Sequence, residues 1–259
     1  MVERDSPRIE RAVLGTGVAS PEFWGVTEDT SEWLRWLGTC AYVGVRGPRS
    51  AETLVDWGFD GDMEICGDPA LLLRPEAHPD PDGPIVVAPA WTGGELWGKS
   101  DETVYAHIAD AVTAWARSGR EVVLMSCHPT DDRPILMIER MLGDIDVGYH
   151  SGYLDVGASH RLIAGSSLVV GERLHACVLA AASGRPFVGI EYRPKVADFA
   201  DSVGMSEFVT RSDQLSGDRL VALADGAMAS SLDEMNRAVE RYRSLLGRAG
   251  KRIETAVRG

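Results

Sequence analysis

The residues best suited to chemistry lie in the segment VVGERLHACVLAAASG, residues 169–184. A strand is predicted to end at Gly171, and Arg173 and His175 then stand at the start of an alanine-rich helix. Because they are two residues apart in an extended turn, both can face one cleft while Leu174 points into the core. A guanidinium beside the N–H groups of a helix start suits an anion. Histidine, with a pKa of about 6.5, suits a general acid. The alternative is a histidine that only packs at the helix start.

Two other segments place cationic and polar side chains directly after predicted strands. In IEYRPKV, Tyr192 and Lys195 follow one strand. In VRGPRS, Arg46 follows another strand, and Arg49 and Ser50 stand at the next helix start. Several polar side chains at one strand end favour a binding site, although Lys195 can also be a solvated first-turn charge.

A third segment, WTGGELWG, contains Gly93 and Gly94. Adjacent glycines let the backbone approach a ligand closely, or simply form a flexible turn. The segment has neither GxGxxG nor GxxxxGK[ST] spacing, so it carries no dinucleotide or nucleotide-triphosphate fingerprint. In CHPTDDR, Asp131 or Asp132 is expected to cap the following helix, with contact to a sugar hydroxyl as the functional alternative.

Most of these residues are positioned by predicted strands and helices that alternate regularly along the chain. Strands are predicted at residues 85–90, 121–126, 166–171 and 186–190, and helices at 101–119, 133–143, 174–184 and 194–204. Short apolar runs between helices indicate strands buried on both faces, hence a parallel sheet with right-handed crossovers. We predict a complete, doubly wound Rossmann-like C-terminal domain over residues 85–228, with ligands at the carboxyl ends of its strands.

Upstream, the segment HPDPDGP at residues 78–84 is predicted to be the domain hinge. Residues 1–77 form a partial N-terminal α/β domain, with strands at 11–18 and 41–46 and helices at 31–38 and 50–58. Residues 232–259 form a C-terminal amphipathic helix, because apolar residues recur at alternating spacings of three and four.

Composition excludes several classes of protein. Acidic residues outnumber basic ones 39 to 26, and a net charge of −13 argues against partners such as nucleic acid or an anionic membrane. No apolar run is long enough for a membrane span, and the charged start MVERDSPRIER does not match a secretion signal, so we expect a cytoplasmic protein. The cysteines form no CxxC pair and the histidines no HExxH pair, so no metal site is expected.

The ordered set of segments resembles the polysaccharide pyruvyl transferase family. The resemblance rests on VRGPRS followed by AETLVDWG, then GDPALLL, and later VVGERLHACVLAAASGRPFVGIEYRPKVADFADSVG, over roughly residues 11–225. It implies a two-domain α/β fold of the GT-B type, with the active site between two Rossmann-like halves. Relative to the family, the chain begins almost at the strand of residues 11–18. We therefore expect an open sheet edge there and a possible homo-oligomer.

Family members transfer the carbon skeleton of phosphoenolpyruvate to two hydroxyls of a sugar, forming a pyruvate ketal and releasing phosphate. On this resemblance, Arg46 matches the arginine of the first family motif, and Arg173 and His175 match its Arg-Leu-His motif. Lys195 matches the lysine of a late family element.

The predicted function is therefore pyruvyl transfer in exopolysaccharide and cell-envelope biosynthesis, with phosphoenolpyruvate and a saccharide as partners and no metal or organic cofactor. Phosphoenolpyruvate carries a phosphate and a carboxylate, so its pocket needs fixed cations. The candidate catalytic residues are His175, Arg173 and Arg46, and the candidate substrate-binding residues are Lys195, Arg49, Ser50, Tyr192, Gly93 and Gly94. The alternatives are a nucleotide-sugar glycosyltransferase or epimerase of GT-B architecture, and a catalytically inactive binding subunit.

Overall fold

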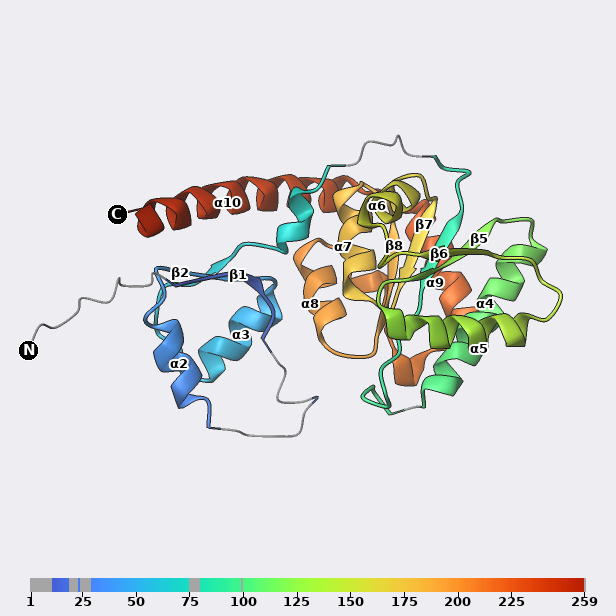
Figure 1. Cartoon of the computed structure of the whole chain (residues 1–259), viewed down its shortest axis with the longest axis horizontal. Helices are drawn as coiled ribbons and strands as arrows, with labels where there is room; N and C mark the ends of the chain where they lie inside the picture. The colour runs from blue at the N-terminus through green and yellow to red at the C-terminus, as the bar shows by residue number, and fades with distance from the viewer. Residues whose placement is uncertain (1–10, 19–22, 24–28, 75–79, 99, 259) are drawn as a thin grey trace, which may run out of the picture. The chain divides into compact units, whose positions relative to one another are not determined.

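The computed structural model describes residues 11–18, 23, 29–74, 80–98 and 100–258 (Figure 1). The chain packs into two compact units. The smaller contains residues up to Pro69 and again from Arg241 onward, and the larger contains Ala70–Glu240. The predicted hinge at residues 78–84 begins outside the described residues, and the predicted domain boundaries stay a prediction.

The smaller unit is built on a parallel sheet with the strand order β1-β2-β3. Its elements are β1 (Ala12–Thr16), β2 (Tyr42–Val45), β3 (Glu64–Ile65), α2 (Ser31–Leu37) and α3 (Pro48–Asp56). Val43 and Val45 of β2 pack against Leu54 of α3 and against Phe59. Helix α3 begins at Pro48, where the missing N–H costs no helical hydrogen bond. The strands and helices predicted here are confirmed.

The larger unit is built on a parallel sheet with the order β6-β5-β4-β7-β8-β9. The strands are β4 (Ile85–Ala88), β5 (Val122–Ser126), β6 (Gly148–Ser151), β7 (Leu168–Gly171), β8 (Phe187–Glu191) and β9 (Val209–Arg211). The central strands β4 and β7 are buried along their whole length. This confirms the predicted parallel, doubly wound α/β fold.

The direction of strand addition reverses between β4 and β7. The chain runs outward from β4 through β5 to β6, crosses back to β7 beside β4, and continues outward through β8 to β9. In open parallel sheets, the carboxyl ends of the strands at such a reversal flank a crevice that binds ligands. The fold therefore favours the loops after β4 and β7 as the place for a ligand.

Helices cover this sheet in two groups (Figure 1). Helix α4 packs against α5 and α9, and α7 packs against α6 and α8. Their bounds are α4 (Asp101–Arg117), α5 (Asp132–Leu142), α6 (Val156–Ala164), α7 (Leu174–Ala182), α8 (Lys195–Ser202) and α9 (Gly217–Ala229). The structure also contains four short 3-10 helices among the described residues, namely η1 (Pro69–Leu72), η2 (Pro129–Asp131), η3 (Ser206–Phe208) and η4 (Ser212–Gln214). The last helix is α10 (Asp233–Arg258). The sequence prediction missed β3, β6, β9, α6 and α9.

The start of α7 lies very close to the end of β7. A Cβ added at Gly171 would stand 2.6 Å from Cys177 Sγ, so Gly171→Ala should lower the free energy of unfolding by about 1–3 kcal/mol. The control is Gly247→Ala in α10, where an added Cβ meets nothing within 4 Å. This change should raise the free energy of unfolding by about 0.5–1 kcal/mol, because glycine is less favourable than alanine inside a helix. Urea unfolding measures both, and stabilisation by Gly171→Ala would contradict the close approach.

Candidate functional site

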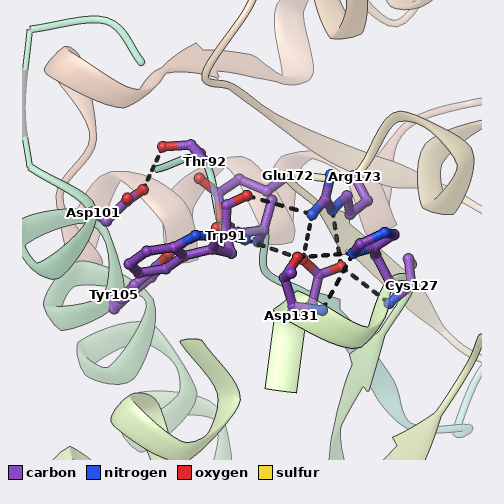
Figure 2. Close-up of polar contacts among 11 residues, drawn as sticks. Trp91, Thr92, Asp101, Tyr105, Cys127, Asp131, Glu172 and Arg173 are labelled. Atoms are coloured by element: carbon purple, nitrogen blue, oxygen red, sulfur yellow. Dashed lines mark hydrogen bonds and ion pairs between the residues drawn. The ribbon is translucent and has the colours of Figure 1, made fainter. Parts of the chain in front are cut away.

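The loops that follow β4, β5 and β7 are joined by one carboxylate, that of Asp131 in η2 (Figure 2). Asp131 is fully buried. It accepts hydrogen bonds from Trp91 N at 3.1 Å and from Cys127 N at 3.3 Å. It also accepts two hydrogen bonds from Arg173, one from Nε at 2.9 Å and one from Nη2. The carboxylate therefore fixes three loops around the reversal of strand order.

Arg173 supplies the positive charge of this site from the residue directly before α7. Its guanidinium engages both oxygens of Asp131, and its Nη2 also lies 3.5 Å from the Trp91 carbonyl oxygen. Burial alone would lower the pKa of Arg173, but the hydrogen bonds and the charge of Asp131 outweigh burial and raise it. About a fifth of the side chain stays exposed, at 21%. Arg173 is therefore a permanent cation with access to solvent.

Glu172 precedes this arginine, and its side chain is fully buried. Oε2 accepts a hydrogen bond from Ala90 N at 2.7 Å, which ties the end of β7 to the loop after β4. Within the described part of the chain, no residue offers a hydrogen-bond partner to the other oxygen, Oε1. Burial raises the pKa of Glu172 to about 8, despite the opposing effect of the Ala90 N–H.

The loop after β4 is held by α4. The Thr92 hydroxyl donates to Asp101 Oδ1 at 2.6 Å, and Gly94 N donates to Asp101 Oδ2 at 3.1 Å. Gly93 and Gly94 have φ values of 68° and 85°, a region that favours glycine. The Tyr105 hydroxyl donates to the Ala90 carbonyl at 2.8 Å. The glycines are thus required by the turn itself, and their contact with a ligand stays a prediction.

The segment after β8 meets the same edge of the sheet. Arg193 forms an ion pair with Glu95 in the loop after β4. Tyr192 is buried, and Lys195 Nζ lies 4.8 Å from the centre of its ring. His175 is exposed in the first turn of α7. The carboxyl edge of this sheet thus brings together the predicted site residues of the larger unit, namely Gly93, Gly94, Arg173, His175, Tyr192 and Lys195.

The remaining predicted residues belong to the smaller unit. Arg46 follows β2, and its Nη1 lies 3.7 Å from Asp68 Oδ2. A Cβ at Gly17 would stand 2.0 Å from Arg46 Nη2, so the loop after β1 lies directly against this guanidinium. Ser50 is buried and accepts a hydrogen bond from Val18 N at 3.0 Å, whereas Arg49 is exposed on α3. Ser50 therefore has a structural contact, and a ligand contact for these residues stays a prediction.

Comparison with known proteins decides the family. The sequence model described as polysaccharide pyruvyl transferase matches residues 6–194, which is more than half of the chain. The chain belongs to the polysaccharide pyruvyl transferase family. No curated protein matches it in sequence.

Solved structures similar to this family member have GT-B folds. S. aureus MnaA, solved with UDP, is 12% identical with a TM-score of 0.64, and the match covers 96% of this chain and 70% of that one. A putative UDP-N-acetylglucosamine 2-epimerase from Listeria monocytogenes is 13% identical with a TM-score of 0.60, covering 95% and 68%. The calicheamicin glycosyltransferase CalG4 is 20% identical with a TM-score of 0.52, covering 91% and 58%. At these identities the similarity establishes a GT-B-like fold alone.

The structure corrects the sequence analysis of this family member at two acidic residues. Asp131 occupies the N-cap position of α5, as expected, but its side chain makes no capping hydrogen bond and instead binds Arg173. Asp132 is the first residue of α5 and accepts hydrogen bonds from two tyrosine hydroxyls. The sequence analysis did not single out Glu172 as a site residue. The signal that could have found it is a glutamate placed directly between Gly171, which ends a strand, and Arg173.

Among the residues that the structure describes, no cluster of three or more His, Cys, Asp or Glu residues is arranged to hold a metal ion. None of the helices they form is long and apolar enough to span a membrane.

Asp131→Asn should lower the free energy of unfolding by about 3 kcal/mol, as expected when a buried ion pair loses one partner. The asparagine side chain has only one acceptor oxygen. Its NH₂ group would face N–H donors that now bind the second carboxylate oxygen, and two donors cannot form a hydrogen bond with each other. Asp132→Asn is the matched control. Asp132 accepts from the hydroxyls of Tyr149 and Tyr153, both at 2.9 Å, and hydroxyls can rotate to accept from an amide. The control should cost less than about 1 kcal/mol. Equal losses in urea unfolding would contradict the role given to Asp131.

Glu172 predicts a pH dependence of stability. Its pKa is about 8 in the folded protein against an ordinary value of 4.5, so between these values the folded state holds a proton that the unfolded state has lost. The free energy of unfolding should therefore fall as the pH rises through this window, by up to about 1.4 kcal/mol per pH unit from this group. Glu172→Gln removes that contribution, so variant stability relative to wild type should rise between about pH 5 and about pH 8. Parallel pH profiles would show that Glu172 titrates normally.

Proposed function

We propose that the chain transfers the three-carbon skeleton of phosphoenolpyruvate to two hydroxyls of a saccharide acceptor, forming a cyclic pyruvate ketal and releasing phosphate. Membership of the polysaccharide pyruvyl transferase family supports a transferase with a saccharide acceptor. The observation that carries the proposal is a permanent cation, Arg173, held at the reversal of strand order in a parallel sheet.

Phosphoenolpyruvate brings a phosphate and a carboxylate, which both need fixed positive charge. In the larger unit, Arg173 and Lys195 stand at the carboxyl edge of the sheet and are proposed to bind these groups. Tyr192, Gly93 and Gly94 lie at the same edge and are proposed to line the site. Arg46 of the smaller unit is proposed as a further cation for the donor, and Arg49 and Ser50 as its neighbours.

In this reaction the methylene carbon of the donor gains one proton and becomes a methyl group. The bond between the central carbon and the phosphate oxygen is broken. The first hydroxyl adds to the central carbon of the donor and gives its proton to the solvent, while a general acid protonates the methylene. The second hydroxyl then forms a bond to the same carbon and also loses its proton to the solvent, as the bond from that carbon to the phosphate oxygen breaks, phosphate leaves with the electron pair, and the ketal closes. His175 is proposed as the general acid, because it is exposed in the first turn of α7, two residues from Arg173, and histidine is the side chain most often used for proton transfer. The chemistry calls for no metal or organic cofactor, and we place it in the cytoplasm.

The direct test incubates the full chain with phosphoenolpyruvate and a panel of saccharides, and follows phosphate release. The proposal expects release that depends on the acceptor, with a ketal-bearing product. Acceptor-dependent release of a nucleoside diphosphate from a nucleotide sugar would favour a glycosyltransferase instead. Binding of saccharides without any turnover would favour an inactive binding subunit.

His175→Asn should lower turnover by about 10²- to 10⁴-fold, the usual contribution of a positioned proton donor, with donor affinity largely kept. The control is His107→Asn in α4, where His107 Nδ1 lies 3.9 Å from Asp110 Oδ2, and this change should leave turnover unchanged. Steady-state kinetics and calorimetric binding of phosphoenolpyruvate measure both. Full turnover by His175→Asn would end the general-acid assignment, and loss of donor binding would move His175 into the anion site.

A further inference from the structure

The carboxyl group of Glu172 takes no part in the reaction proposed above, yet it lies beside the cation of the site (Figure 2). It is fully buried, with one hydrogen bond from Ala90 N at 2.7 Å to Oε2. Oε1 has no hydrogen-bond partner among the described residues. A buried carboxylate with a single N–H donor lacks the contacts that offset its loss of hydration. The geometry therefore disfavours the ionised form.

The neighbouring charges act in the same direction. Arg173 gives both its Nε and its Nη2 hydrogen bonds to Asp131, so its charge is already balanced by another carboxylate. The titratable groups that face Glu172 are Asp101 and Tyr105 of α4, Asp131 of η2, Arg173 of its own turn, and Tyr192 after β8. They include two acidic groups and one cation, so an ionised Glu172 would be a third negative charge. Burial, followed by Asp101 and Asp131, raises the pKa of this carboxyl, against the opposing effects of the Ala90 N–H and Arg173.

We propose that Glu172 is a positioning residue that must be a neutral acid for an anion to bind at Arg173, so that donor binding above neutral pH takes up a proton. The inference rests on the proposed function, because phosphoenolpyruvate is the anion. When the donor meets a molecule with ionised Glu172, one proton comes from the solvent and adds to a carboxylate oxygen. No bond of the donor forms or breaks in this step.

The physical reason is the charge next to the donor. With neutral Glu172, the ion pair of Arg173 and Asp131 has no net charge, and the partly exposed guanidinium can attract an anion. With ionised Glu172, a negative charge stands one residue from that guanidinium and repels the donor. A glutamate that served only to bind the Ala90 N–H would do so in either protonation state and would give no proton uptake.

The experiment measures phosphoenolpyruvate binding to the full chain by calorimetry between about pH 7 and about pH 9.5, in pairs of buffers with different heats of ionisation. Above neutral pH the donor is fully ionised, so it does not itself titrate in this range. We expect the dissociation constant of the wild type to rise by about 30-fold over this range, and binding near pH 8.5 to take up a measurable fraction of one proton.

Two variants isolate the group responsible. Glu172→Gln keeps the shape and lacks the titrating proton, so its affinity should change little with pH and its proton uptake should vanish. Glu121→Gln, the same change at an exposed glutamate of the same unit, should behave as the wild type. If Glu172→Gln does not fold, the pH at which proton uptake by the wild type is half-complete decides: a midpoint near pH 8 supports the proposal, and a midpoint near pH 6.5, the value of a free imidazole, overturns it.

The outcomes separate this proposal from the proposed function. Absence of proton uptake in the wild type, or equal uptake in Glu172→Gln, overturns the proposal and leaves pyruvyl transfer untouched. Proton-coupled binding of phosphoenolpyruvate without acceptor-dependent phosphate release supports the proposal and overturns the proposed function. If phosphoenolpyruvate binds at no pH, both are overturned.

Discussion

A single buried carboxylate, that of Asp131, receives four hydrogen bonds at the place where the sheet reverses its strand order. Hydrogen bonding between parallel strands stops at their carboxyl ends, so the backbone N–H groups just beyond need other partners. Asp131 supplies them for Trp91 and Cys127, and Glu172 supplies one for Ala90. This edge of the sheet is therefore held by acidic side chains that complete the backbone hydrogen bonding of the loops.

A charged acceptor in such a place requires a cation. Removing a carboxylate from water costs several kcal/mol unless an opposite charge with good geometry compensates it. Arg173 meets this need with two parallel N–H donors while a third contact reaches the Trp91 carbonyl, which the point charge of a lysine cannot do. The same requirement places a permanent positive charge at the ligand edge of the sheet. Structure and proposed function thus depend on one ion pair.

The sequence predicted the elements whose burial is uniform. The apolar runs that became β4, β5, β7 and β8 are buried on both faces, and such strands have a clear signature. Strands β6 and β9 were missed because they lie at the edges of the sheet, are short, and contain polar residues such as those of GYHS. Edge strands need less apolar surface, so their sequences resemble loops.

The candidate site was predicted only in part, because some of its contacts join residues that are far apart in the sequence. Arg173 and His175 could be found because they follow a strand and precede a helix within one short segment. The partner of Arg173 is 42 residues away, and a local pattern gives no information on which of two adjacent aspartates turns inward. The buried state of Glu172 likewise depends on α4 and on the loop after β4, which only the folded chain brings beside it.

The most direct measurement of this account is a double-mutant cycle between Asp131 and Arg173, using Asp131→Asn, Arg173→Gln and the double variant in urea unfolding. If the ion pair holds the three loops together, the double variant should lose about 2 kcal/mol less than the sum of the two single losses, because each single change leaves a buried group without its partner. Losses that add within about 0.5 kcal/mol would mean that the two residues act independently, and would contradict the central place given to their interaction.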